Sequence, residues 1–184
     1  MAKTTHVDRA ITADQLLNLS IPDKQVELVR GTLIVREPPG YRHGRVAFRI
    51  ASIISQFASA HDLGVVVSAE TGFKLFADPD TVRAADAAFI VRDRAPVPEP
   101  VGYLTIAPDL IVEVLSPSDR AGEVQSKVSD WLTAGSRLVW VIDPARRRGV
   151  VYRADASVAL LGEDDALDGE DVLPGFSCAL AAVL

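Results

Sequence analysis

The segment from residue 108 to residue 142 places the strongest constraint on the fold. It contains two almost wholly apolar runs, residues 110–115 and 138–142, on either side of a stretch with the periodicity of an amphipathic helix. Apolar runs of this length are typical of strands that are buried on both faces of a sheet. The segment therefore predicts two central strands joined by a crossover helix. We expect this helix to begin near Pro117, with Ser116 or Ser118 as its N-cap, and to end at Gly135.

The remaining elements surround this unit. Apolar periodicity and turn residues predict helices over residues 12–19 and 41–61, a hairpin of strands 26–29 and 32–35, and further strands over residues 65–67, 71–76, 86–91, 149–152, 158–161 and 172–173. This order favours an α/β or α+β-like fold with a mixed central β-sheet flanked by helices, an N-terminal hairpin and a C-terminal β-meander. No repeat or long linker divides the sequence, so we expect one domain over residues 1–184.

Composition excludes several classes of protein. The chain has 184 residues, of which 48% are hydrophobic and 24% charged, which is typical of a compact domain and not of a disordered chain. Its net charge of -6 argues against broad, nonspecific adhesion to nucleic acid. No apolar stretch approaches the roughly 18 residues of a membrane span. The charges within residues 1–15 and the presence of a single cysteine predict a cytoplasmic protein. We expect that cysteine, Cys178, to be a small buried hydrophobe.

Two carboxylates interrupt the most apolar strands. Asp86 begins one predicted strand and Glu113 lies within another. A buried carboxylate needs a cation, a hydrogen-bond donor or a metal, because an unpaired charge in an apolar environment is costly. Two carboxylates on central strands could share a divalent cation. The alternative is that Asp86 marks the start of a strand and that Glu113 pairs with an arginine.

Three further residues could belong to the same site. Lys127 lies roughly 60° from Val124 around the predicted crossover helix, beside Trp131, so it can reach inward; alternatively its stem covers the edge of the core. His43 projects from the first long helix toward the sheet. It could be a hydrogen-bonded core or cap residue, or it could transfer a proton or position another group. Glu27 is a secondary candidate, because its strand could present it to either face.

Arginines cluster in two segments. Arg42, Arg45 and Arg49 lie on the first long helix, and residues 146–148 form an arginine turn. Both clusters could contact phosphates, although the turn is more typical of a solvated hairpin tip. Few aromatic residues accompany them in the sequence, so stacking on single-stranded nucleic acid is not indicated. The sequence has no Walker loop, dinucleotide-binding glycine pattern, histidine-rich zinc motif or nucleophile elbow.

Several of these segments together resemble one family. The resemblance covers nearly the whole chain and is strongest over residues 108–118 and the following helix that carries a lysine. The chain is similar to the Uma-type restriction endonuclease family, a branch of the PD-(D/E)XK nuclease superfamily. The segments that carry the resemblance are residues 26–33, Pro38, Pro39 and His43, residues 86–91, residues 108–118, Lys127, residues 140–144 and residues 173–176.

The resemblance implies a nuclease-like core and a metal site. Asp86, Glu113 and the backbone carbonyl of Val114 would hold a divalent cation. The superfamily usually has a lysine two residues after the glutamate, where this chain has Leu115, and the resemblance implies that Lys127 takes its place. Ala85 replaces the proline that usually precedes the aspartate, which weakens the motif without removing a ligand.

The implied function is hydrolysis of DNA phosphodiester bonds with Mg²⁺, for which Mn²⁺ could substitute. Lys127 would stabilise charge on the phosphate, while His43 and Glu27 would orient water or a second metal. Cleavage of both strands would suit a homodimer. Two alternatives stay open: a noncatalytic module that uses the same fold for dimerisation or DNA binding, and a hydrolase that acts on RNA or a small phosphoester.

Overall fold

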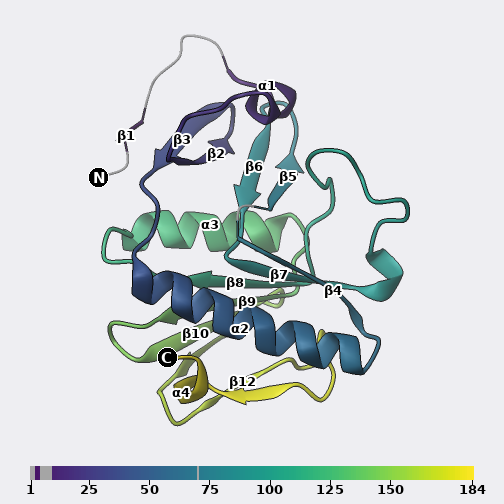
Figure 1. Ribbon diagram of the computed structural model, residues 1–184, viewed down its shortest axis with the longest axis vertical. Coiled ribbons are helices and arrows are strands. Elements are labelled where there is room, and N and C mark those ends of the chain that lie inside the picture. Colours follow the sequence, from purple (N-terminus) through teal and green to yellow (C-terminus); the bar gives the residue numbers. More distant parts are fainter. Residues whose placement is uncertain (1–2, 5–9, 70) are drawn as a thin grey trace.

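A six-stranded mixed sheet forms the centre of the protein (Figure 1). The structure is a computed structural model, and it describes residues 3–4, 10–69 and 71–184; part of the polar N-terminal stretch lies outside the described residues. In order across the sheet, the strands are β11 (Val158–Leu161), β10 (Arg148–Arg153), β9 (Leu138–Asp143), β8 (Leu110–Val114), β7 (Ala87–Val91) and β4 (Gly64–Ser68). Strands β8 and β9 are parallel, and the other neighbours are antiparallel.

Helix α3 (Ala121–Thr133) connects the parallel strands β8 and β9 and confirms the predicted crossover. Its predicted start was wrong, because the N-cap is Arg120 and not Ser116 or Ser118. The backbone N–H and the hydroxyl of Ser116 both donate to Asp119 Oδ2, at 2.7 and 2.9 Å. These local hydrogen bonds hold the segment as a turn, so the helix begins only after it.

The two faces of the six-stranded sheet are covered by different elements (Figure 1). Strand residues alternate between the faces, so Leu110 and Val112 pack against α2 (Tyr41–Ala60), whereas Ile111 packs in the cluster of α3. The cluster on the α2 face also contains buried residues from the C-terminal segment. Because α3 covers one face and α2 the other, side chains from both helices can meet at the end of β8 near the α2 N-terminus.

A second sheet holds the N-terminal hairpin. Its order is β1 (Lys3–Thr4), β3 (Thr32–Arg36), β2 (Gln25–Val29), β6 (Thr81–Ala84) and β5 (Gly72–Phe76). The hairpin is confirmed, and helix α1 (Ala13–Leu17), capped by Thr12, packs beside it. The sequence prediction missed β6. This strand has only four residues and carries the charged Arg83, which is buried.

The chain ends in a small antiparallel pair. Strands β12 (Ala166–Asp168) and β13 (Ser177–Ala179) pair with each other, and β13 leads into α4 (Leu180–Val183). The remaining short element, η1 (Arg92–Arg94), directly follows β7. The strand predicted at residues 172–173 was wrong, because Val172 and Leu173 lie in turns and are buried against the α2 face. Cys178 is only partly buried. Among the described residues, no helix combines the length and apolarity that a bilayer crossing needs.

Candidate active site

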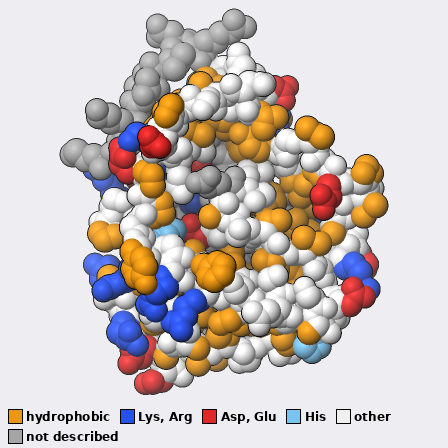
Figure 2. All heavy atoms as spheres, in the orientation of Figure 1, with side chains coloured by type: hydrophobic (Ala, Val, Ile, Leu, Met, Phe, Trp, Pro, Cys, Tyr) orange, Lys and Arg blue, Asp and Glu red, His pale blue; other side chains and the backbone are white. Residues whose placement is uncertain are grey.

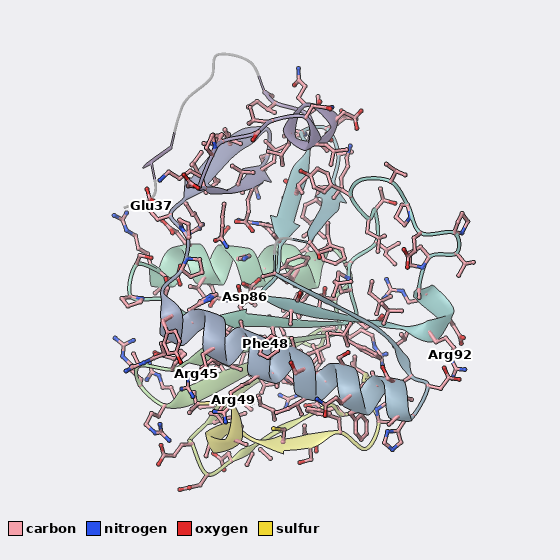
Figure 3. The ribbon with its side chains drawn as sticks, viewed as in Figure 1. Glu37, Arg45, Phe48, Arg49, Asp86 and Arg92 are labelled. Atoms are coloured by element: carbon pink, nitrogen blue, oxygen red, sulfur yellow. The ribbon has the colours of Figure 1, made fainter. Side chains whose placement is uncertain are left out.

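A cavity of about 150 Å³ lies where the end of β8, the start of α2 and the inner side of α3 come together. Its lining includes five of the six residues that the sequence predicted for the site: His43, Asp86, Glu113, Val114 and Lys127. Figure 3 shows Asp86 above the N-terminal half of α2, between that helix and α3. Residues that are up to 84 positions apart in the sequence are therefore neighbours here.

Asp86 lies in the link between β6 and β7, just before β7 begins. Its Oδ2 accepts a hydrogen bond from the backbone N–H of Val114 at 2.7 Å and lies 3.2 Å from His43 Nε2. Burial by itself would lower the pKa of His43, but the hydrogen bond and the charge of Asp86 raise it above its ordinary value. The other ring nitrogen, Nδ1, is buried and has no hydrogen-bond partner among the described residues.

Glu113 points from β8 toward α3, and both of its oxygens accept hydrogen bonds. Lys127 Nζ donates to Oε2 at 2.8 Å, and the indole N–H of Trp131 donates to Oε1 at 2.8 Å. The pairing with an arginine that we considered for Glu113 is therefore wrong. Burial raises the pKa of Glu113 to about 7, because the opposing effect of Lys127 is smaller and the charge of Asp86 raises it further.

Lys127 projects inward from α3 and lies between two carboxylates. Besides Glu113, it lies 3.4 Å from Glu27 Oε1. Burial opposes its charge, but the negative charges of Glu113, Glu27 and Asp86 raise its pKa above the ordinary value. Lys127 is therefore a protonated cation at neutral pH and not a general base.

Glu27 belongs to a neighbouring ion-pair network. Its Oε2 lies 3.1 Å from Arg83 Nη1, and its Oε1 accepts a hydrogen bond from the backbone N–H of Ala84 at 3.0 Å. Burial alone would raise its pKa, but Lys127, Arg83 and the Ala84 N–H together lower it to about 2. Glu27 is therefore ionised and faces cations, so its contacts suit positioning of Lys127 better than the orientation of water or a second metal.

The sequence prediction missed three residues that shape the site. Arg83 of β6 pairs with Glu27 of β2 and with Asp130 of α3, which links the second sheet to α3. Arg36 lies 3.3 Å from Glu123 at the rim of the cavity. The sequence placed Trp131 only as a neighbour of Lys127 on the predicted helix, and its position one turn after that lysine was the signal that the two could share a partner.

The donor atoms of the site fit a hard divalent cation. The predicted ligand set is two carboxylates and the Val114 carbonyl, all oxygen donors of the kind that Mg²⁺ prefers. Each carboxylate has about four lone-pair sites, so Asp86 and Glu113 keep acceptor capacity beyond the hydrogen bonds described. The raised pKa of Glu113 comes mainly from burial and to a smaller extent from the charge of Asp86, and a bound cation would oppose both effects. Within residues 3–4, 10–69 and 71–184, no cluster of three His, Cys, Asp or Glu side chains could hold a metal, so the main-chain oxygen is needed as a third ligand.

Comparison with known proteins gives the same family as the sequence motifs. The family model of Uma2, described as "Putative restriction endonuclease", matches residues 13–181. The chain is also similar to the crystal structure of "a putative nuclease belonging to DUF820" from Anabaena variabilis ATCC 29413, with a TM-score of 0.82 and 21% sequence identity over 94% of this chain and 97% of that chain. No curated protein matches.

The structural likeness confirms the expected mixed α/β nuclease fold, and the family match extends over most of the chain, including every residue of the candidate site. The chain therefore belongs to the Uma2 restriction endonuclease family.

Proposed function

We propose that the protein is a metal-dependent endonuclease that hydrolyses DNA phosphodiester bonds. The observation that carries this proposal is the convergence of two carboxylates, a protonated lysine and a histidine on one cavity at the end of β8. The nuclease fold and the family match support the same reaction class.

Asp86, Glu113 and the Val114 carbonyl would hold the cation, for which we propose Mg²⁺, with Mn²⁺ as a substitute. A bound divalent cation would supply Lewis-acid polarisation of the scissile phosphate and a lowered pKa for the attacking water. Asp86 is already fixed in place by the Val114 N–H, and Glu113 is fixed by Trp131. The chain thus orients both carboxylates before any ligand binds.

Lys127 would act on the phosphate, and His43 on a water. The Lys127 ammonium is fixed between Glu113 and Glu27, and it would stabilise the negative charge that develops on the phosphate oxygens. His43 contacts Asp86 through Nε2, and its buried Nδ1, which has no partner among the described residues, would hydrogen-bond an internal water and not the phosphate itself. For cleavage of both strands of a duplex, we propose that two copies associate.

The test is cleavage of supercoiled plasmid with Mg²⁺ or Mn²⁺. We expect the wild type to nick or linearise the plasmid and EDTA to prevent cleavage, whereas Glu113→Gln, Asp86→Asn and Lys127→Met should abolish it. Asp171→Asn is the matched control, because Asp171 is an exposed carboxylate that pairs with Arg137, and neither residue lines the cavity. This control should cleave like the wild type.

Mn²⁺ calorimetry provides the second readout. We expect the wild type and Asp171→Asn to bind Mn²⁺, and Asp86→Asn and Glu113→Gln to lose binding. Absence of both cleavage and Mn²⁺ binding in the wild type would refute the proposal in favour of a noncatalytic module. Unchanged Mn²⁺ binding by the two carboxylate variants would show that the assigned ligands are wrong.

A further inference from the structure

One exposed sector of α2 combines aromatic rings with arginines, and we call it the α2 stripe. Its members are Tyr41, Arg42, Arg45, Phe48 and Arg49, which at 3.6 residues per turn fall within about 120° of the helix circumference. Tyr41 is 86% exposed and Phe48 is 73% exposed. Tyr41 and Phe48 are seven positions apart, which is about two helical turns, so the two rings lie on the same face as the arginines.

The arginines of the α2 stripe are available for an external anion. Within the described part of the chain, Arg42 and Arg49 have no hydrogen bond or ion pair, and Arg45 donates to the backbone carbonyl of Leu184. The arginine turn between β9 and β10 is different, since its arginines pair with nearby carboxylates, Asp143 and Glu163. The chain as a whole has a net charge of -6, so unpaired cations gathered on one helix face form a local exception.

The α2 stripe leads directly to the candidate active site. A cavity of about 700 Å³ begins at Tyr41 and Arg42 and shares His43, Ser116 and Asp119 with the lining of the active-site cavity. Figure 2 shows Lys and Arg side chains gathered beside hydrophobic ones at the lower left of the view. In Figure 3, Arg45, Phe48 and Arg49 lie along α2 below Asp86.

We propose that the α2 stripe binds single-stranded DNA and guides it to the active site. This inference rests on the proposed function and adds single-stranded DNA as a substrate that the site takes besides duplex plasmid. Bases would stack on Tyr41 and Phe48 while the guanidinium groups of Arg42 and Arg49 contact phosphates. At 1.5 Å per residue, Tyr41 and Phe48 are about 10 Å apart along the helix, so two different bases of one strand could stack on the two rings.

The exposed rings favour a single strand over a duplex. In a duplex the base faces are stacked inside, and the outer surface offers phosphates that arginines alone could bind. A single strand offers a free face of each base, which the ring of Phe48 or Tyr41 can cover. An exposed phenylalanine between cations thus adds affinity only when bases are unstacked.

The experiment measures fluorescence anisotropy of a labelled oligo(dT) of about 16 nucleotides, in EDTA and at low salt, so that no cleavage is needed. We expect Phe48→Ala to bind roughly 5- to 150-fold more weakly than the wild type, and Phe48→Trp to retain binding. Arg49→Ala should lower the slope of log affinity against log salt by about 0.7.

The controls use an arginine and a large apolar residue that are exposed elsewhere. Arg92 pairs with Asp62 at the other end of the view in Figure 3, and Leu160 is an exposed apolar residue on β11. Arg92→Ala and Leu160→Ala should bind oligo(dT) like the wild type. Because Phe48 is exposed, circular dichroism melts of its variants should match the wild type.

Three results would overturn the inference. The first is equal affinity of Phe48→Ala and the wild type for oligo(dT), and the second is a duplex of the same length that binds as tightly as oligo(dT). The third is tighter binding of oligo(U), which would assign the surface to RNA.

Failure of the proposed function is recognised separately. Phe48-dependent binding in a protein that neither cleaves plasmid nor binds Mn²⁺ would uphold the α2 stripe and refute the nuclease activity. Cleavage by the wild type without oligo(dT) binding would do the reverse.

Discussion

Replacement of Arg83 by methionine should destabilise the protein strongly. The Arg83 side chain is only 5% exposed and donates to Asp130 Oδ2 at 2.9 and 2.6 Å and to Glu27 Oε2 at 3.1 Å. Methionine keeps the apolar stem but leaves Glu27, 7% exposed, with one cation fewer. Removal of one partner of a buried ion pair costs about 3 to 5 kcal/mol, which for a chain of this size lowers the melting temperature by about 6 to 20 °C.

The pKa of Glu27 gives an independent magnitude and a pH signature. Its fall from 4.5 to about 2 in the folded state corresponds to about 3 kcal/mol, and the cations that cause it include Arg83. Because the folded pKa is the lower one, this stabilisation is complete above pH 4.5 and is lost as the pH falls toward 2. Without Arg83 the pKa of Glu27 is depressed less, so the gap in stability between the wild type and Arg83→Met should narrow over this acidic range.

Urea unfolding at neutral and acidic pH measures both effects. Arg137→Met is the matched control, since Arg137 and Asp171 form an ion pair with side chains that are 40% and 81% exposed. Such surface pairs contribute at most about 1 kcal/mol. If Arg83→Met costs no more than this control at neutral pH, or if its effect is the same at all pH values, the assigned role of the Glu27–Arg83 pair is incorrect.

Three further predictions follow from the site and the backbone. Since Glu113 has a pKa of about 7 without metal, Mn²⁺ affinity should fall by up to about tenfold per pH unit below 7 and level off above it; calorimetry that finds no pH dependence would contradict this. Trp131→Phe removes the indole donor from Glu113 and raises the pKa of that carboxyl further, so the rising limb of the pH–rate profile for plasmid cleavage should move to higher pH by about one pH unit. Gly64→Ala should lower the melting temperature, because a Cβ there would lie 2.1 Å from the Ile90 carbonyl oxygen. Gly122→Ala in α3 adds a Cβ that meets nothing within 4 Å, so it should stabilise the protein by about 0.5–1 kcal/mol. Equal melting temperatures of the two variants would refute this contrast.

Most helices and strands could be predicted because their periodicity is local. Helix α2 and strands β8 and β9 show their apolar pattern directly in the sequence. The errors arose where another part of the molecule decides. Strand β6 is buried through partners in β2 and α3, and the start of α3 is delayed by the hydrogen bonds of Asp119.

The division of the strands between two sheets also could not be predicted. The hairpin of β2 and β3 has the same alternating character as a strand pair of the central sheet, yet it pairs with β6 in a separate sheet. Strand pairing depends on contacts between distant segments, and no single segment contains that information.

For the candidate site, the sequence by itself determined which carboxylates would need a partner. Asp86 and Glu113 stand out because an ionised group within an apolar strand is costly unless it is compensated. Only the tertiary structure decided what compensates them: Lys127 and Trp131 for Glu113, and His43 with the Val114 N–H for Asp86. The reason is physical, since the cost of burying a charge is a property of the residue and its strand, whereas its compensation requires atoms from α2 and α3 that only folding brings within hydrogen-bond distance.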